Sequence, residues 1–287
     1  SHQRGLGMVF QNYALFPHLT IYENIAFPLK MRKMQKAAID EQVARVLNTV
    51  QLPDVQERFA SELSGGQQQR IALARCFVYE PSIILMDEPL GALDKKLRDS
   101  LQREIKHLHD NLGITVIYVT HDQEEAMVMS DRICLMNEGR IEQIGSPADL
   151  YFQPNSIFAA DFLGESNLFA GKVIGQTETG ISIQRVDDIV VSGVCDAEVR
   201  NGETTHYMIR PENIRVHSDE TNEDNLTQGK LKETIMMGQL TKYFLELADG
   251  SEMVATTLTG SGNDPLQLGD QIYFGWSTRD ARIMLSS

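Results

Sequence analysis

Two short stretches of this chain carry residue types that could do chemistry on a phosphate. The first, LSGGQQQR at 63–70, places a hydroxyl and two glycines at the predicted start of a helix. The second is the apolar run 83–86, which ends in Asp87 and Glu88. A helix start exposes backbone N–H groups that bind anions. Two carboxylates at the end of a buried strand suit Mg²⁺ and an attacking water, because buried charges need such compensation. Together the two stretches predict half of a nucleotide-hydrolysing site.

Three further polar residues stand at positions where they could complete this site. His121 comes just after the apolar strand 115–119, and Asp87 and Glu88 come just after the apolar run 83–86. In open parallel sheets, ligands bind at the carboxyl ends of the strands. We therefore expect His121 to sense a γ-phosphate or to support Glu88. Asp94 is placed at the next helix start, where by itself it could be only an N-cap. Gln11 offers donor and acceptor to a metal-bound water, although by itself it could be an ordinary loop amide.

The pattern of elements predicts two domains, 1–160 and 161–287. In the first, helices at 21–31, 37–50, 67–78 and 95–112 alternate with apolar strands, which is typical of an α/β fold with an open parallel sheet. In the second, short strands separated by Gly, Asn and Asp predict a small β-barrel or sandwich, with a polar break at 219–225.

Composition excludes several classes of protein. The net charge is −14, made up of −4 in residues 1–160 and −10 in 161–287, which argues against a nucleic-acid partner. No apolar stretch approaches the roughly 20 residues of a membrane span, and the first residues lack the apolar core of a secretory signal. The cysteines at 76, 134 and 195 are far apart and are predicted to be buried or half-buried thiols, typical of a reducing cytoplasm.

Five motifs, in the same order, resemble those of ABC transporter ATPases. VFQ, ending at Gln11, resembles the Q-loop, LSGGQQQR the signature motif, IILMDEP Walker B, GALD the D-loop and THD the switch histidine. The tail resembles the OB-like, TOBE-type regulatory β-barrel of importers through IRPENI at Ile209–Ile214. FLGESNLF at Phe162–Phe169 and FGWSTRDARI at Phe274–Ile283 are most similar to spermidine/putrescine-type importers.

The resemblance implies a P-loop NTPase fold and a homodimer that closes head to tail over two ATP molecules. Gln11, Asp87, Glu88 and His121 would serve one nucleotide, with Glu88 and His121 catalytic and with Asp87 and Gln11 at Mg²⁺. Asp94 would link the two sites. Four residues of the signature motif would contact the nucleotide held by the partner: Ser64, Gly65, Gly66 and Gln67.

The resemblance also implies partners and a location. Transmembrane permease subunits would receive the protein, in part through the loop Asn12–Thr20, and a solute-binding protein would be an indirect partner. The protein would then be a peripheral one on the cytoplasmic face of the inner or plasma membrane.

One part of the family pattern is missing. Family members carry the phosphate loop G-x-x-x-x-G-K-[ST], Walker A, upstream of the Q-loop, and this sequence has no such segment. We therefore interpret the sequence as truncated at its N-terminus, and we expect the 287-residue polypeptide alone neither to bind ATP tightly nor to hydrolyse it.

Alternative functions remain open at this stage. The leading hypothesis is the ATP-hydrolysing subunit of a polyamine importer, and importers of a sugar or of iron are its nearest alternatives. A soluble ABC ATPase acting on DNA or ribosomes would need basic arms or long coiled-coil insertions. A catalytically inactive fragment that acts as a binding or regulatory module is the third hypothesis.

Overall fold

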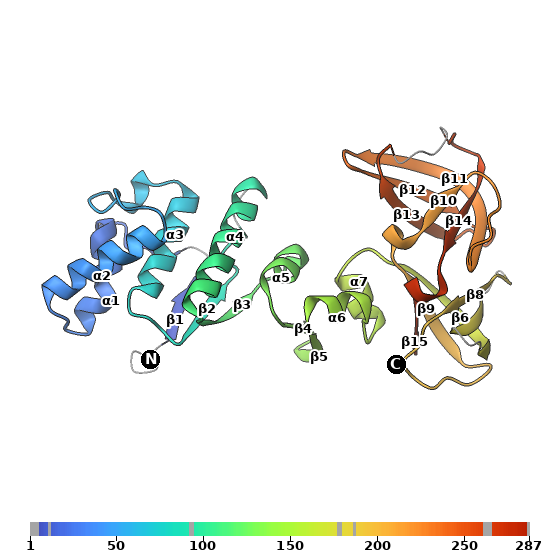
Figure 1. Cartoon of the computed structure of the whole chain (residues 1–287), viewed down its shortest axis with the longest axis horizontal. Coiled ribbons are helices and arrows are strands. Elements are labelled where there is room, and N and C mark those ends of the chain that lie inside the picture. Colours follow the sequence, from blue (N-terminus) through green and yellow to red (C-terminus); the bar gives the residue numbers. More distant parts are fainter. Residues whose placement is uncertain are drawn as a thin grey trace. The chain divides into compact units, whose positions relative to one another are not determined.

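A computed structural model describes residues 6–10, 13–91, 95–176, 180–185, 188–260 and 266–285. They form two compact units, Ser1–Ser130 and Asp131–Ser287 (Figure 1). Residues 131–160 therefore pack with the β-rich unit, although they lie before the change from alternating helices and strands to short strands. The assignment of 1–160 and 161–287 as domains stays a prediction.

The first unit alternates strands and helices as the sequence predicts. Its elements are β1 (Leu6–Val9), α1 (Ile21–Met31), α2 (Lys36–Thr49), the 3₁₀ turn η1 (Ala60–Glu62), α3 (Gly65–Phe77), β2 (Ile83–Asp87), α4 (Lys95–Leu112), β3 (Thr115–Val119) and α5 (Gln123–Met129). Side-chain caps define several helix starts: Thr20 and Glu23 form a reciprocal capping box at α1. Gly113, with φ of +60°, ends α4 in a conformation that favours glycine.

The three strands of the first unit form a parallel sheet in the order β1-β2-β3. Residues Val9, Ile84 and Met86 on one face are at most 1% exposed and share a core with Leu73 of α3 and Leu101 of α4. Asp87 pairs with Val119, so the carboxyl ends of β2 and β3 are level. This confirms the predicted strand–helix–strand unit and its register at the edge where the candidate site lies.

The opposite face of this sheet is apolar and open among the described residues. Met8 of β1 and Ile117 and Val119 of β3 are 42%, 51% and 53% exposed. Parallel sheets in proteins are normally covered on both faces. The described residues thus build one covered layer and leave one apolar face of the sheet to solvent.

The second unit begins with a two-stranded hairpin and two short helices and continues as strands. Its elements are β4 (Ile133–Asn137), β5 (Arg140–Gly145), α6 (Pro147–Phe152), α7 (Ile157–Phe162), β6 (Asn167–Gln176), β7 (Ile181–Arg185), β8 (Val190–Gly193), β9 (Thr204–Ile209), η2 (Pro211–Asn213), β10 (Arg215–His217), β11 (Asn225–Met237), β12 (Leu240–Glu246), β13 (Glu252–Leu258), β14 (Gln271–Trp276), η3 (Thr278–Asp280) and β15 (Ala281–Leu285).

The strands from β6 onward form two antiparallel sheets of five strands, β15-β9-β6-β7-β8 and β10-β14-β11-β12-β13. The first sheet closes on itself: Val194, just after β8, donates to Ala281 O at 2.9 Å and accepts from Ile283 N at 2.9 Å. Closure removes the free edges of the sheet. The predicted β-barrel is therefore confirmed. It is closed by one parallel β-bridge between Val194 and Arg282.

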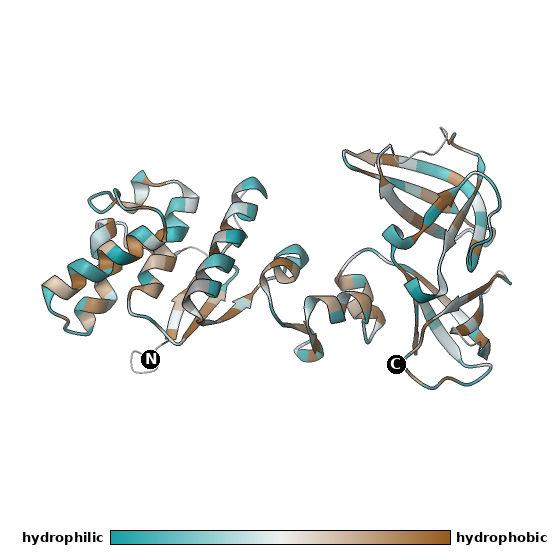
Figure 2. Cartoon of the chain, in the orientation of Figure 1, coloured by the Kyte–Doolittle hydropathy of each residue, from teal (hydrophilic) through white to brown (hydrophobic). Residues whose placement is uncertain are grey.

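Apolar side chains of both sheets share one core, which includes Ile183, Leu245 and Trp276. Figure 2 shows hydrophobic (brown) and hydrophilic (teal) residues alternating along the strands, as expected where one face of a sheet is buried and the other is exposed to solvent. Two buried amides join the sheets. Asn167 accepts from Val254 N at 2.7 Å and donates to Val254 O at 2.8 Å, and Asn225 pairs in the same way with Ser192.

Some local features differ from the prediction. The strand β11 was not predicted, because its last six residues are exposed on both faces and show no alternation. Helices α5, α6 and α7 were also missed, since six or seven residues are too few for a helical period. Cys134 is exposed, not buried or half-buried, whereas Cys76 is buried and Cys195 is intermediate. None of the described helices is both long and apolar enough to cross a bilayer.

Candidate functional site

The site is built at the carboxyl ends of β2 and β3. Asp87 is the last residue of β2, and Glu88 N donates to Val119 O at 2.9 Å, which extends the ladder by one residue. His121 follows β3 by two residues, and its Nδ1 lies 3.0 Å from Glu88 Oε1. The structure therefore brings together the predicted carboxylate and the predicted imidazole, which lie 33 residues apart in the sequence.

The backbone turns sharply at Glu88. Its φ is +42°, in the left-handed region that non-glycine residues rarely adopt. Such a conformation persists only when its surroundings hold it. Leu90 is fully buried after the turn, and the buried Gln69 of α3 donates from Nε2 to Pro89 O at 3.1 Å. The helix that carries the signature-like motif is thus bonded directly to the turn that presents Glu88.

The electrostatics of the pair follow from this contact. The hydrogen bond to Glu88, with the carboxylate charge, raises the pKa of His121 above its ordinary value. The imidazole is 76% exposed and the Glu88 side chain 31% exposed. A carboxylate bonded to an accessible imidazole can orient a water molecule and hold or pass on a proton.

The start of α3 confirms the expected cap. Ser64 is the N-cap residue: its Oγ accepts from Gln67 N at 3.4 Å, and Gln67 Oε1 accepts from Ser64 N at 3.0 Å. Gly65 and Gly66 form the first turn, whose N–H groups have no partner within an α-helix. The side-chain hydrogen bonds described for Ser64 and Gln67 are with each other and not with Glu88 or His121. Their role toward a phosphate stays a prediction.

The remaining predicted ligands differ in what the structure says of them. Asp87 is exposed at the strand end and open to a ligand. Gln11 and Asp94 lie outside the described residues. Within the described ranges, no group of three or more His, Cys, Asp or Glu is placed to hold a metal ion. One exposed carboxylate beside a phosphate is still a donor set that fits Mg²⁺, because this ion keeps several waters and binds few protein oxygens.

The loop before α1 is held by two residues that the sequence analysis missed. The fully buried Asn24 accepts from Phe16 N at 2.8 Å and donates to the carbonyls of Phe16, Leu19 and Thr20. Arg75 of α3 donates to Ala14 O at 2.7 Å. The ring of Phe27, 40% exposed, lies 4.9 Å from that of Phe16. The loop is therefore fixed, and it lies beside the exposed aromatic ring of Phe27 in α1. A buried Asn within an amphipathic helix is the signal that could have identified it.

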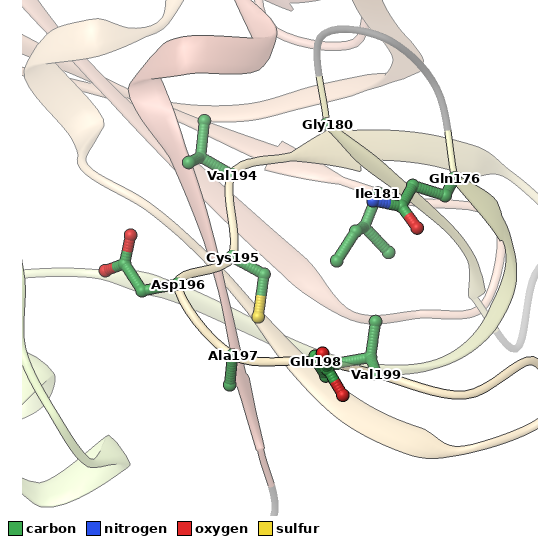
Figure 3. Close-up of a pocket in the computed structure, with 9 residues that line it drawn as sticks. All are labelled: Gln176, Gly180, Ile181, Val194, Cys195, Asp196, Ala197, Glu198 and Val199. Atoms are coloured by element: carbon green, nitrogen blue, oxygen red, sulfur yellow. The ribbon is translucent and has the colours of Figure 1, made fainter.

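The second unit contains a cavity of about 540 Å³ between the ends of β6, β7 and β8. Figure 3 shows Cys195 and Ile181 facing this space, while the carboxylate of Asp196 points away from it. That carboxylate pairs with Arg282 at 2.6 Å. None of the predicted site residues lines the cavity.

Comparisons with known proteins agree along almost the whole chain. Residues 1–91 match the family model described as ABC transporter, and residues 207–284 match that of the TOBE domain. The spermidine/putrescine import ATP-binding protein PotA of Thermotoga maritima is 40% identical over 99% of this chain and 78% of its own length. The protein of the same name from Bacillus cereus is 42% identical over 97% of this chain and 76% of its own.

Among solved structures, a part of an ABC transporter complex from Clostridium perfringens aligns with 56% of this chain and 62% of its own. Its TM-score is 0.49 and its identity is 27%.

Proposed function

The chain belongs to the ABC transporter family and, within it, to the spermidine/putrescine import ATP-binding proteins, and we propose on this premise that it hydrolyses ATP to energise a polyamine importer. The identity of about 40% to PotA proteins, which spans both units of the chain, is the observation that carries this function. The contact between Glu88 and His121 supports it, since phosphoryl transfer depends chiefly on positioned groups and charge stabilisation.

Glu88 is the residue that polarises the attacking water. Its carboxylate stands beyond the strand end, where the left-handed turn presents it, and remains 31% exposed and therefore accessible to water. His121 orients this carboxylate through Nδ1 and offers its other ring nitrogen to a γ-phosphate oxygen. The raised pKa of His121 favours the protonated ring, which is a donor to an anion.

Asp87 and Gln11 are the residues that would hold Mg²⁺. When bound, this ion would neutralise charge on the β- and γ-phosphates. Asp87 would reach it through water from the end of β2, and Gln11 follows the neighbouring strand β1. The β1–β2 pairing sets Val9 opposite Met86, so the carboxyl ends of the two strands lie at the same edge of the sheet, which supports the assignment.

A second copy of the chain completes each nucleotide site in this proposal. Ser64, Gly65, Gly66 and Gln67 would meet the γ-phosphate held by the other copy, and Asp94 would link the two sites. The support is geometric: the N–H groups of Gly65 and Gly66, in the first turn of α3, have no acceptor within the helix and suit an anion, and these residues make no described contact with Glu88.

Permease subunits are the membrane partners of this protein. The rigid loop before α1, together with the exposed ring of Phe27 in α1 and the adjacent, tilted ring of Phe16, is the surface proposed to receive a permease helix. In this arrangement the protein lies peripherally on the cytoplasmic face of the membrane. A solute-binding protein on the other side selects the cargo.

Uptake of labelled spermidine and putrescine tests the function. A strain that lacks the locus should lose uptake, and the intact gene should restore it. Glu88→Gln should not restore uptake. Glu138→Gln is the matched control, because Glu138 is an exposed glutamate that also has a positive φ, +48°, but stands in a turn of the second unit. Unchanged polyamine uptake in the deletion strain, with lost uptake of a sugar or of iron, would remove the polyamine assignment.

A further inference from the structure

The position of His121 is not explained by packing of its own side chain. The imidazole is 76% exposed, and Glu88 is the neighbour that the structure describes for it. An exposed ring has several rotamers available and is held by one hydrogen bond only weakly. The backbone on which the ring stands must therefore supply the positional accuracy that the contact with Glu88 requires.

The buried carboxylate of Glu125 accepts hydrogen bonds from residues on the N-terminal side of His121. Glu125 of α5 is 2% exposed, and its Oε2 accepts from Tyr118 Oη at 2.8 Å and from Thr120 Oγ1 at 2.7 Å. Thr120 Oγ1 also accepts from Asp122 N at 2.9 Å. The two neighbours of His121 in the chain, Thr120 and Asp122, are thus bonded to one another, and Thr120 is also bonded to the Glu125 carboxylate.

An arginine of another helix joins this cluster. Arg98, in the first turn of α4, donates from Nη1 to Asp122 Oδ2 at 2.8 Å, and its Nε lies 3.9 Å from Glu125 Oε1. Asp122 Oδ1 accepts from Glu125 N at 3.2 Å, which caps α5. The cluster therefore links the turn that carries His121 to the start of α4, which directly follows the segment 91–94.

The cluster satisfies a carboxylate that would otherwise be costly to bury. Burial, together with the charge of Glu125, raises the pKa of Tyr118 above its ordinary value, so the phenol remains a hydrogen-bond donor. The positive charge of Arg98 faces Asp122 and Glu125, and both Arg98 and Asp122 are about three-quarters buried. Buried, mutually satisfied charge networks fix geometry, because breaking one partner leaves the others unpaired.

We propose that Glu125, Arg98 and Asp122 are positioning residues that hold His121 against Glu88 and make its position depend on the start of α4. This proposal rests on the function proposed above for Glu88 and His121. A displacement of the first turn of α4 would move Asp122 and, with it, the adjacent imidazole. A purely structural role would stabilise the unit without any effect that passes through His121.

ATP hydrolysis by the assembled transporter gives the first readout. Arg98→Gln and Glu125→Gln should lower kcat by roughly tenfold or more with little change in KM for ATP, because a misplaced group slows the chemical step. Arg103→Gln is the matched control, an exposed arginine on the same helix, and should behave as the wild type. In a His121→Ala background Arg98→Gln should have no further effect, since residues that act as a unit are not additive.

NMR titration of His121 in the 287-residue chain gives a second readout that needs no ATP hydrolysis. Loss of the Glu88 contact should lower the pKa of His121 in Arg98→Gln, where removing a positive charge would by itself raise it, but not in Arg103→Gln. In Glu125→Gln the lost carboxylate charge also lowers this pKa directly, so Arg98→Gln and Thr120→Val decide the test. Thr120→Val, which keeps the shape of the side chain, should show the same shift even if a charge variant does not fold. An unchanged pKa in the folded variants, or an equal loss of kcat with and without His121, would overturn the proposal. If the wild-type transporter does not hydrolyse ATP, the proposed function fails while the titration still decides the positioning role.

Discussion

Replacing Arg210 by methionine is expected to destabilise the second unit more than any single surface change. Arg210 follows β9 and is 2% exposed. Its Nη1 lies within 2.6–3.2 Å of Ser166 Oγ and of three backbone carbonyls, those of Ala160, Gly164 and Glu165. Its Nη2 donates to Tyr151 O at 3.1 Å, and the guanidinium lies 4.2 Å from the centre of the Tyr151 ring. The side chain thus joins the barrel to the chain that leads into it.

The magnitude follows from the number of hydrogens available. Nη1 has two N–H groups for four oxygens, so together with Nη2 about three charged hydrogen bonds are made at once. Each is worth about 1.5–3 kcal/mol, and the ring contact adds about 1–2 kcal/mol. Burial of the charged guanidinium costs free energy and lowers the pKa of Arg210. Removing this charge in the methionine variant offsets part of the loss. A net destabilisation of about 3–5 kcal/mol is a large fraction of a typical stability of about 5–15 kcal/mol.

Urea unfolding followed by tryptophan fluorescence measures this change in the complete chain. Trp276 is the one tryptophan of the sequence and is 1% exposed in the core of the second unit, so its emission reports this unit. With a slope of about 2 kcal/mol per M, Arg210→Met should lower the midpoint by about 2 M urea. Arg210→Lys should lie in between, because an ammonium keeps the charge without the planar fork.

Arg200→Met is the matched control, because Arg200 is exposed in the same unit and should change stability by no more than about 0.5 kcal/mol. A midpoint for Arg210→Met within the range of this control would refute the reasoning. It would show that the carbonyls around residues 160–166 find other partners, so that the arginine does not hold this segment.

Three further predictions concern the site and the thiols. Glu88→Gln should lower the pKa of His121 in an NMR titration, because the carboxylate raises it. In the wild type the pair stabilises the fold below the ordinary imidazole pKa and loses this contribution as pH rises through the raised value. If His121 keeps its wild-type pKa in Glu88→Gln, the carboxylate is not the cause of the raised value. Ser64→Gly should cost only a few tenths of a kcal/mol in unfolding followed by circular dichroism, since glycine is a tolerable N-cap, yet it should abolish polyamine uptake. Normal uptake would remove the phosphate role of the hydroxyl. Finally, a thiol reagent should label the exposed Cys134 quickly and Cys76 only on unfolding, because burial raises the pKa of the Cys76 thiol to about 11; equal rates would contradict the packing around Cys76.

The contact between Glu88 and His121 at the candidate site could be predicted from the sequence because the strands that carry it are local and regular. The apolar runs before Asp87 and before His121 are each of strand length, and a parallel register places their carboxyl ends at one edge. The family motifs then add chemistry to that edge. The amphipathic helix Lys95–Leu112 and the strand Gln271–Trp276 were likewise predicted with the bounds that the structure shows. Periodicity and turn residues are properties of neighbouring positions, so the sequence displays them directly.

What only the tertiary structure decided are the contacts between residues far apart in the chain. The left-handed turn at Glu88 is held by Gln69, and the arginine at position 210 finds its acceptors near residue 160. No periodicity signals either contact, because both side chains are polar and their partners are backbone oxygens. The barrel likewise closes through a bridge between Val194 and Arg282, 88 residues apart. The sequence by itself determined the longer periodic elements and the residue types at their ends, whereas burial and long-range hydrogen bonding determined how accurately those groups are held, since only the folded chain excludes water from them.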